Sequence, residues 1–91
     1  MRIVNKHYLS VPTNGSDSGS RIYCIELEPD VLVDVKFIKE TGLIYVMQNH
    51  DGSVAYKSSS LDDHTLPGYQ VDEKAVIALV TADLKKEVAS G

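Results

Sequence analysis

The side chains of this protein that most often act as nucleophiles, bases or metal ligands are one cysteine and three histidines. Cys24 lies in the middle of a predicted strand with no flanking glycine turn to expose it, so we interpret it as a structural thiol. Glu26 and Glu28 lie two residues apart on the same strand and share a face, which is typical of a solvated sheet face rather than of an acid–base pair. The sequence therefore predicts no catalytic residue and favours a non-enzymatic protein over an enzyme.

The histidines do not follow a metal-ligand pattern. His50 precedes Asp51 in a predicted turn, and His64 follows Asp62 and Asp63 in the next predicted loop. Neighbouring residues in a turn point apart, and this spacing matches none of the usual zinc arrangements. A single cysteine also excludes an intrachain disulfide and a cysteine-rich zinc site. We therefore expect no metal and no other cofactor.

Aromatic residues provide the main alternative to a protein without a catalytic or ligand-binding site. The predicted strand pairing brings Tyr45 and Tyr56 together on one face of a sheet, with His7 nearby if the first strand is their neighbour. These three side chains could line a small-ligand cleft between the sheet and a helix. The other interpretation is that the tyrosines pack against the helix and keep their hydroxyl groups at its rim.

Composition narrows the class of protein further. The chain has 91 residues, which corresponds to a single domain spanning 1–91, and its contents of 43% apolar and 24% charged residues are ordinary. The formal net charge is -4 and the basic residues are scattered, which argues against a nucleic-acid partner. No stretch approaches the roughly 20 apolar residues of a membrane helix, and the N-terminus lacks the apolar core of a signal peptide. We therefore expect a cytoplasmic protein with no membrane partner.

The apolar pattern predicts an α+β fold, in which one C-terminal helix packs on a face of a mostly antiparallel sheet. The expected strands cover residues 3–11, 21–28, 31–40, 43–48 and 54–58, and the expected helix covers residues 72–88. Runs rich in Gly, Ser and Pro predict a flexible polar loop at 12–20 and a second loop at 59–70. The 12–20 loop lacks the lysine and the following helix of a phosphate-binding loop.

Two segments decide this fold. Residues 31–40 could form a helix bounded by Asp30 and Gly42, but the alternation of β-branched and aromatic residues along the segment favours a strand. The pattern of residues 72–88 predicts an amphipathic helix. Asp72 favours a helix start at this point, because its carboxylate can cap the free amides of the first turn. The apolar stripe of this helix consists of Val76, Val80, Leu84 and Val88.

The turn before residue 43 sets the register of the predicted sheet. If residues 40–42 form a three-residue loop with Gly42 in the left-handed conformation, Phe37 pairs with Tyr45 and Val35 pairs with Met47. We then expect residues 49–52 to form a hairpin turn that returns the chain beside 43–48. The face toward the helix would carry Val33, Val35, Phe37, Leu43, Tyr45, Met47, Val54 and Tyr56.

The same register leaves apolar residues on the opposite face, which one helix cannot also cover. We therefore predict an oligomer interface formed by Leu32, Ile38, Ile44 and Val46. The resulting hypothesis is a small interaction protein that forms a homodimer or larger assembly. It would bind a protein partner through a sheet face or edge, as accessory, antitoxin or immunity proteins do. The alternative is a small-molecule-binding module, or a minimal enzyme, that uses the Tyr45, Tyr56 and His7 cleft.

Overall fold

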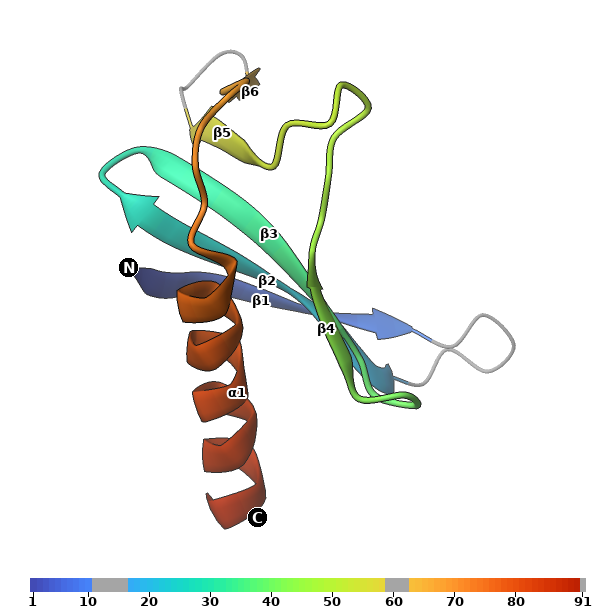
Figure 1. The fold of residues 1–91 in the computed structure, drawn as a ribbon. Helices are drawn as coiled ribbons and strands as arrows, with labels where there is room; N and C mark the ends of the chain where they lie inside the picture. Colours follow the sequence, from blue (N-terminus) through green and yellow to red (C-terminus); the bar gives the residue numbers. More distant parts are fainter. Residues whose placement is uncertain (11–16, 59–62, 91) are drawn as a thin grey trace.

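A computed structural model describes residues 1–10, 17–58 and 63–90 of the chain, and the side chains of 1–10, 19–57 and 65–87. It shows the predicted α+β fold, in which an antiparallel sheet carries one C-terminal helix on a single face (Figure 1). The elements are β1 (Arg2–Ser10), β2 (Asp17–Glu28), β3 (Val31–Ile38), β4 (Leu43–Val46), β5 (Ala55–Ser58), β6 (Asp63–Thr65) and α1 (Glu73–Ser90). The strand order is β1-β2-β3-β5-β6, and β4 also pairs with β3.

The two predicted loops are shorter than expected. β2 begins at Asp17, so the last residues of the predicted 12–20 loop belong to a strand, and β6 forms inside the predicted 59–70 loop. Residues 11–16 and 59–62 lie outside the described part of the chain.

The ambiguous segment 31–40 forms a strand over Val31–Ile38, as the alternation predicts. Glu28 pairs with Val31 across a tight turn in which Asp30 has a positive φ of 70°, a conformation that Asp tolerates better than most residues. The turn therefore connects β2 directly to β3, and the chain continues as a strand where the alternative was a helix. Along β3, Val31, Val33 and Val35 are buried, and the residues between them are partly exposed.

β4 and β5 both pair with the same side of β3, so the predicted hairpin between them is wrong. β4 pairs with the second half of β3, and β5 pairs with its first half, in the same direction. The segment 47–54 leaves the sheet between them (Figure 1). Its turn closes on itself, because the amide of Asn49 donates to the carbonyl of Ser53 at 2.8 Å and Asp51 accepts from the amide of Ser53 at 2.9 Å.

The predicted register of β4 is wrong by one residue. Phe37 pairs with Ile44 and Ile38 pairs with Leu43, so the connecting turn contains residues 39–42 rather than three residues. Gly42 does adopt the predicted positive φ, at 72°. A slip of one residue inverts every side chain of a strand. Ile44 and Val46 therefore lie on the helix side of the sheet, and Leu43 and Tyr45 lie on the other side.

The core lies between α1 and the helix side of the sheet. Its largest fully buried side chains, each 0% exposed, are Tyr23, Ile25, Val33, Val35, Val76 and Val80. The helix begins as predicted, because the Asp72 carboxylate accepts from the amide of Ala75 at 3.1 Å. No described helix is long and apolar enough to span a membrane.

Candidate functional site: the open face of the sheet

The sheet face opposite α1, called the open face below, is not covered by any described helix or strand. Residues that pair directly across adjacent strands share a face, and the register places on this one Ile22, Cys24, Glu26, Leu32, Asp34, Lys36, Ile38, Leu43, Tyr45 and Tyr56. All of them are partly or fully exposed, whereas their neighbours Arg21, Tyr23, Ile25, Val33 and Val35 are buried. One face of the sheet is therefore buried and the other is accessible to solvent.

The open face has a polar centre formed by Cys24, Asp34 and Tyr56. Cys24 and Asp34 pair directly across β2 and β3, and the hydroxyl of Tyr56 donates to Oδ1 of Asp34 at 3.1 Å. The same hydroxyl lies 3.5 Å from the sulfur of Cys24. These contacts give the Tyr56 hydroxyl and Oδ1 of Asp34 partners within the sheet.

The electrostatics of this centre do not activate a nucleophile. Burial raises the pKa of the Cys24 thiol, and burial with the contact to Cys24 raises the pKa of Tyr56. A thiol with a raised pKa stays protonated at neutral pH and is a poor nucleophile. The interpretation of Cys24 as a structural thiol stays a prediction.

The predicted ligand cleft does not lie under the helix. Tyr45 pairs with Lys36, Tyr56 with Leu32 and His7 with Ile22, so all three predicted site residues face away from α1. His7 is on β1, three strand positions from β4, which corresponds to about 14 Å. The structure therefore does not bring His7 together with the tyrosines. Their role in ligand binding stays a prediction.

The predicted oligomer interface is divided between the two faces. Leu32 and Ile38 lie on the open face as expected. Ile44 and Val46 instead pack against the core, because the turn at 39–42 reverses the predicted orientation of β4. The exposed apolar residues of β4 are Leu43, at 52% exposure, and Tyr45, at 36%.

A charged cluster on the helix side holds the second half of α1 against the sheet. It contains Lys6, Tyr8, Arg21, Tyr23, Asp83 and Glu87. Glu87 accepts from Nζ of Lys6 at 2.7 Å and from the hydroxyl of Tyr8 at 3.0 Å, and it also pairs with Arg21. The bond from Lys6, assisted by that from Arg21, lowers the pKa of Glu87 to about 2.

The other carboxylate of this cluster is Asp83, which accepts from Lys6 at 2.9 Å and from the hydroxyl of Tyr23 at 3.0 Å. Burial and this bond raise the pKa of Tyr23 to about 12. Because each carboxylate faces a cation, the cluster fastens the helix rather than presenting a reactive group. The four-residue spacing of Asp83 and Glu87 predicts that both carboxylates lie on one face of the helix. The nearby sequence does not indicate that this face meets β1 and β2.

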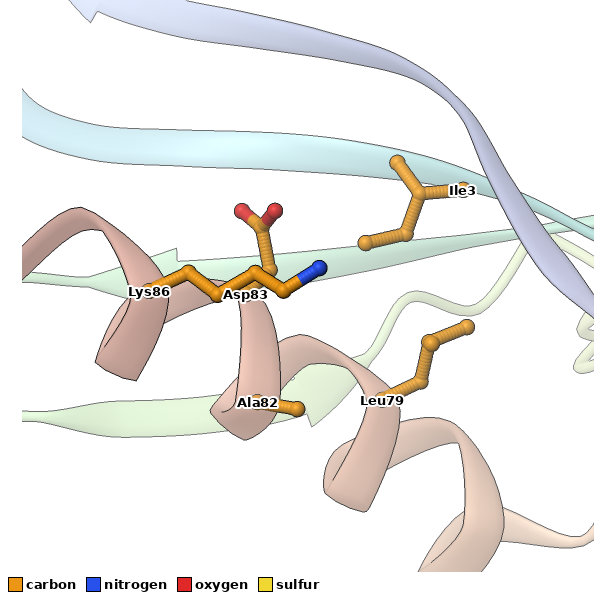
Figure 2. Close-up of a pocket in the computed structure, with 5 residues that line it drawn as sticks. All are labelled: Ile3, Leu79, Ala82, Asp83 and Lys86. Atoms are coloured by element: carbon orange, nitrogen blue, oxygen red, sulfur yellow. The ribbon is translucent and has the colours of Figure 1, made fainter. Parts of the chain in front are cut away.

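A shallow hollow of about 130 Å³ lies beside this cluster, between β1 and α1 (Figure 2). It is lined by Ile3, Leu79, Ala82, Asp83 and Lys86. Pockets for drug-sized ligands have volumes of roughly 300–1,000 Å³. The hollow is therefore too small to serve as the predicted cleft.

Within the part of the chain described with side chains, no group of three His, Cys, Asp or Glu residues is placed to hold a metal ion. The predicted loop residues Asp62, Asp63 and His64 lie outside that part. Comparison with protein-family models, with curated proteins and with solved structures finds no match to this chain.

Proposed function

We propose that this protein is a small non-enzymatic interaction domain that binds another protein through the open face of its sheet and associates with itself. The role would be that of an accessory, antitoxin-like or immunity-like protein. The observation that carries the proposal is the one-sided sheet. Ile22, Leu32 and Ile38 lie partly exposed on the open face, while alternate residues of the same strands are fully buried under α1.

The energetics favour burial of this face against a partner. Each large apolar side chain withdrawn from water contributes about 1.5–3 kcal/mol before the costs of association. The hydrogen bond from Tyr56 to Asp34 at 3.1 Å offsets part of the cost of burying the Asp34 carboxylate, and a partner would have to supply further donors to it. Ile38 and Leu43 pair on this face, and exposed apolar side chains that lie together often mark an interaction site.

The charges of the open face favour a protein partner over a nucleic acid. Glu26 and Asp34 lie on the same face as Lys36, and Glu26 also pairs with Arg2 at 2.9 Å. Phosphate binding needs a clear excess of basic residues. A mixed set of charges instead provides selectivity between protein surfaces.

The test is a quantitative pull-down from the source lysate with wild-type protein and with L32K and I22K as bait. Each substitution places a charge on the open face, and A78K places the same charge on an exposed position of α1 as a matched control. We expect specific proteins to bind wild type and A78K and to be lost with L32K and I22K. Equal binding by all four proteins, with thermal melting showing that each is folded, would show that the open face is not the binding surface.

A further inference from the structure

Two of the edge strands, β1 and β4, differ strongly in their protection. β1 carries irregularities between Ile3 and Asn5 and between Tyr8 and Ser10, and it includes the charged residues Arg2 and Lys6. Bulges and charges are the features that keep exposed edge strands from pairing with other chains. β4 contains only Leu43, Ile44, Tyr45 and Val46, with no charge, proline or register shift.

The backbone of β4 presents, on its outer side, hydrogen-bonding groups for which the described residues provide no partner. The amide of Met47 donates to the carbonyl of Asp34 at 2.9 Å, which makes these residues a hydrogen-bonded pair. Such pairs alternate along an antiparallel ladder, so the backbone of Tyr45 faces β3. The N–H and C=O groups of Ile44 and Val46 therefore point outward. Among the described residues, no strand pairs with this side of β4.

We propose that β4 pairs antiparallel with β4 of a second copy of this chain, about a two-fold axis at Tyr45. This inference rests on the proposed interaction function and names one of its partners. A strand paired with itself in this way is self-complementary, because Ile44 of each copy exchanges both backbone hydrogen bonds with Val46 of the other.

The side chains fit the same arrangement. The two Tyr45 side chains meet in a non-hydrogen-bonded pair, in which opposite Cα atoms are only about 4.5 Å apart. Aromatic pairs at such positions stabilise a sheet, and the absence of charge in β4 avoids like-charge repulsion. Leu43 and Tyr45, which are 52% and 36% exposed, lose exposed surface. Since a two-fold axis perpendicular to the sheet keeps the faces aligned, the open faces of the two copies become one continuous surface.

The first test is Y45E. The substitution places a carboxylate opposite Lys36 within the chain, which supports the fold, but it places two carboxylates against each other across the two-fold axis. We expect wild type and the control A78E to dimerise with increasing concentration in sedimentation equilibrium, and Y45E to stay monomeric over the same range. Mixing Y45E with Y45K/K36E should restore association, because the facing charges are then opposite.

Hydrogen exchange gives a second test that needs no variant. The amides of Ile44 and Val46 should gain protection as the protein concentration rises, while the amide of Tyr45 should be protected at every concentration. A monomer at all concentrations, or a dimer that Y45E leaves intact, would overturn the edge pairing.

Two variants separate this inference from the proposed function. If L32K abolishes dimerisation and Y45E does not, the copies associate through the open face, and the edge inference fails while the proposed function stands. If Y45E abolishes dimerisation but L32K still captures the same proteins as wild type, the edge pairing stands and the open face is not the site of partner binding.

Discussion

The two faces of this sheet place their polar groups in opposite ways. On the helix side the centre is apolar, with Val33 and Val35 fully buried, and the charged groups Lys6 and Arg21 lie at the rim, paired with α1. On the open face the polar group Asp34 lies at the centre, and Cys24, Leu32 and Lys36 lie next to it. The first arrangement excludes water and forms a core. The second remains compatible with water and still offers apolar area to a partner.

The comparison also explains why the two faces should respond differently to substitution. Residues on the helix side are held by the surrounding side chains, so removing one leaves a cavity. Residues on the open face have solvent on one side. When such a side chain is truncated, water fills the space and no cavity forms. Partner binding should show the reverse order. Substitutions on the open face should weaken binding directly, whereas substitutions in the core should weaken it only by destabilising the fold.

The largest expected difference is between two isoleucines on β2. We expect I25A to lower the free energy of unfolding by about 2–5 kcal/mol, because Ile25 is 0% exposed in the core. We expect I22A, on the open face of the same strand, to lower it by less than about 1 kcal/mol. Urea denaturation of both variants measures the difference, and equal losses would mean that the open face is buried in the protein in solution.

The second prediction concerns the charged cluster. E87Q should lower the free energy of unfolding by about 1–2 kcal/mol, more than most exposed ion pairs contribute and less than a fully buried pair. The reason is that the Arg21 side chain, only 9% exposed, loses its charged partner. K74Q, at an exposed position on the same helix, is the control and should have little effect on denaturation.

The same variant tests the pH dependence. The pKa of Glu87 is lowered to about 2 in the folded protein, while its ordinary value is about 4.5. A lowered pKa stabilises the fold above the ordinary value, and this contribution is lost as the pH falls from about 4.5 toward 2. The stability advantage of wild type over E87Q should therefore shrink across this range. An advantage that stays constant down to pH 2 would exclude the proposed role of the Glu87 charge.

The smallest expected effect is on the reactivity of Cys24. Since burial raises the pKa of this thiol, its reaction rate with iodoacetamide should rise with pH at a higher midpoint than that of free cysteine. The comparison protein is the same chain in urea, where the midpoint should return to the ordinary value. A midpoint below that of free cysteine in the folded protein would point instead to an activated thiol on the open face.

Part of the candidate site could be predicted from the sequence. The alternation along 21–28 correctly separates Tyr23 and Ile25, in the core, from Cys24 and Glu26, on the open face. The charged cluster could not be predicted, because it joins Lys6 and Arg21 to residues more than 60 positions away in the chain. No local pattern encodes which side chains a helix will meet when it crosses a sheet.

The sequence by itself determined that Tyr23, Ile25, Val33 and Val35 point inward, because these positions of one parity are apolar while Glu26, Asp34 and Lys36 of the other parity are charged. It also determined the start of α1, through the cap at Asp72. Only the tertiary structure decided the orientation of β4 and the strand with which β5 pairs. Leu43, Ile44, Tyr45 and Val46 are apolar in both parities, so burial alone cannot choose between the two registers. The choice depends on the turn at 39–42 and on the packing of Ile44 and Val46 against the core, which exist only when distant parts of the chain have come together.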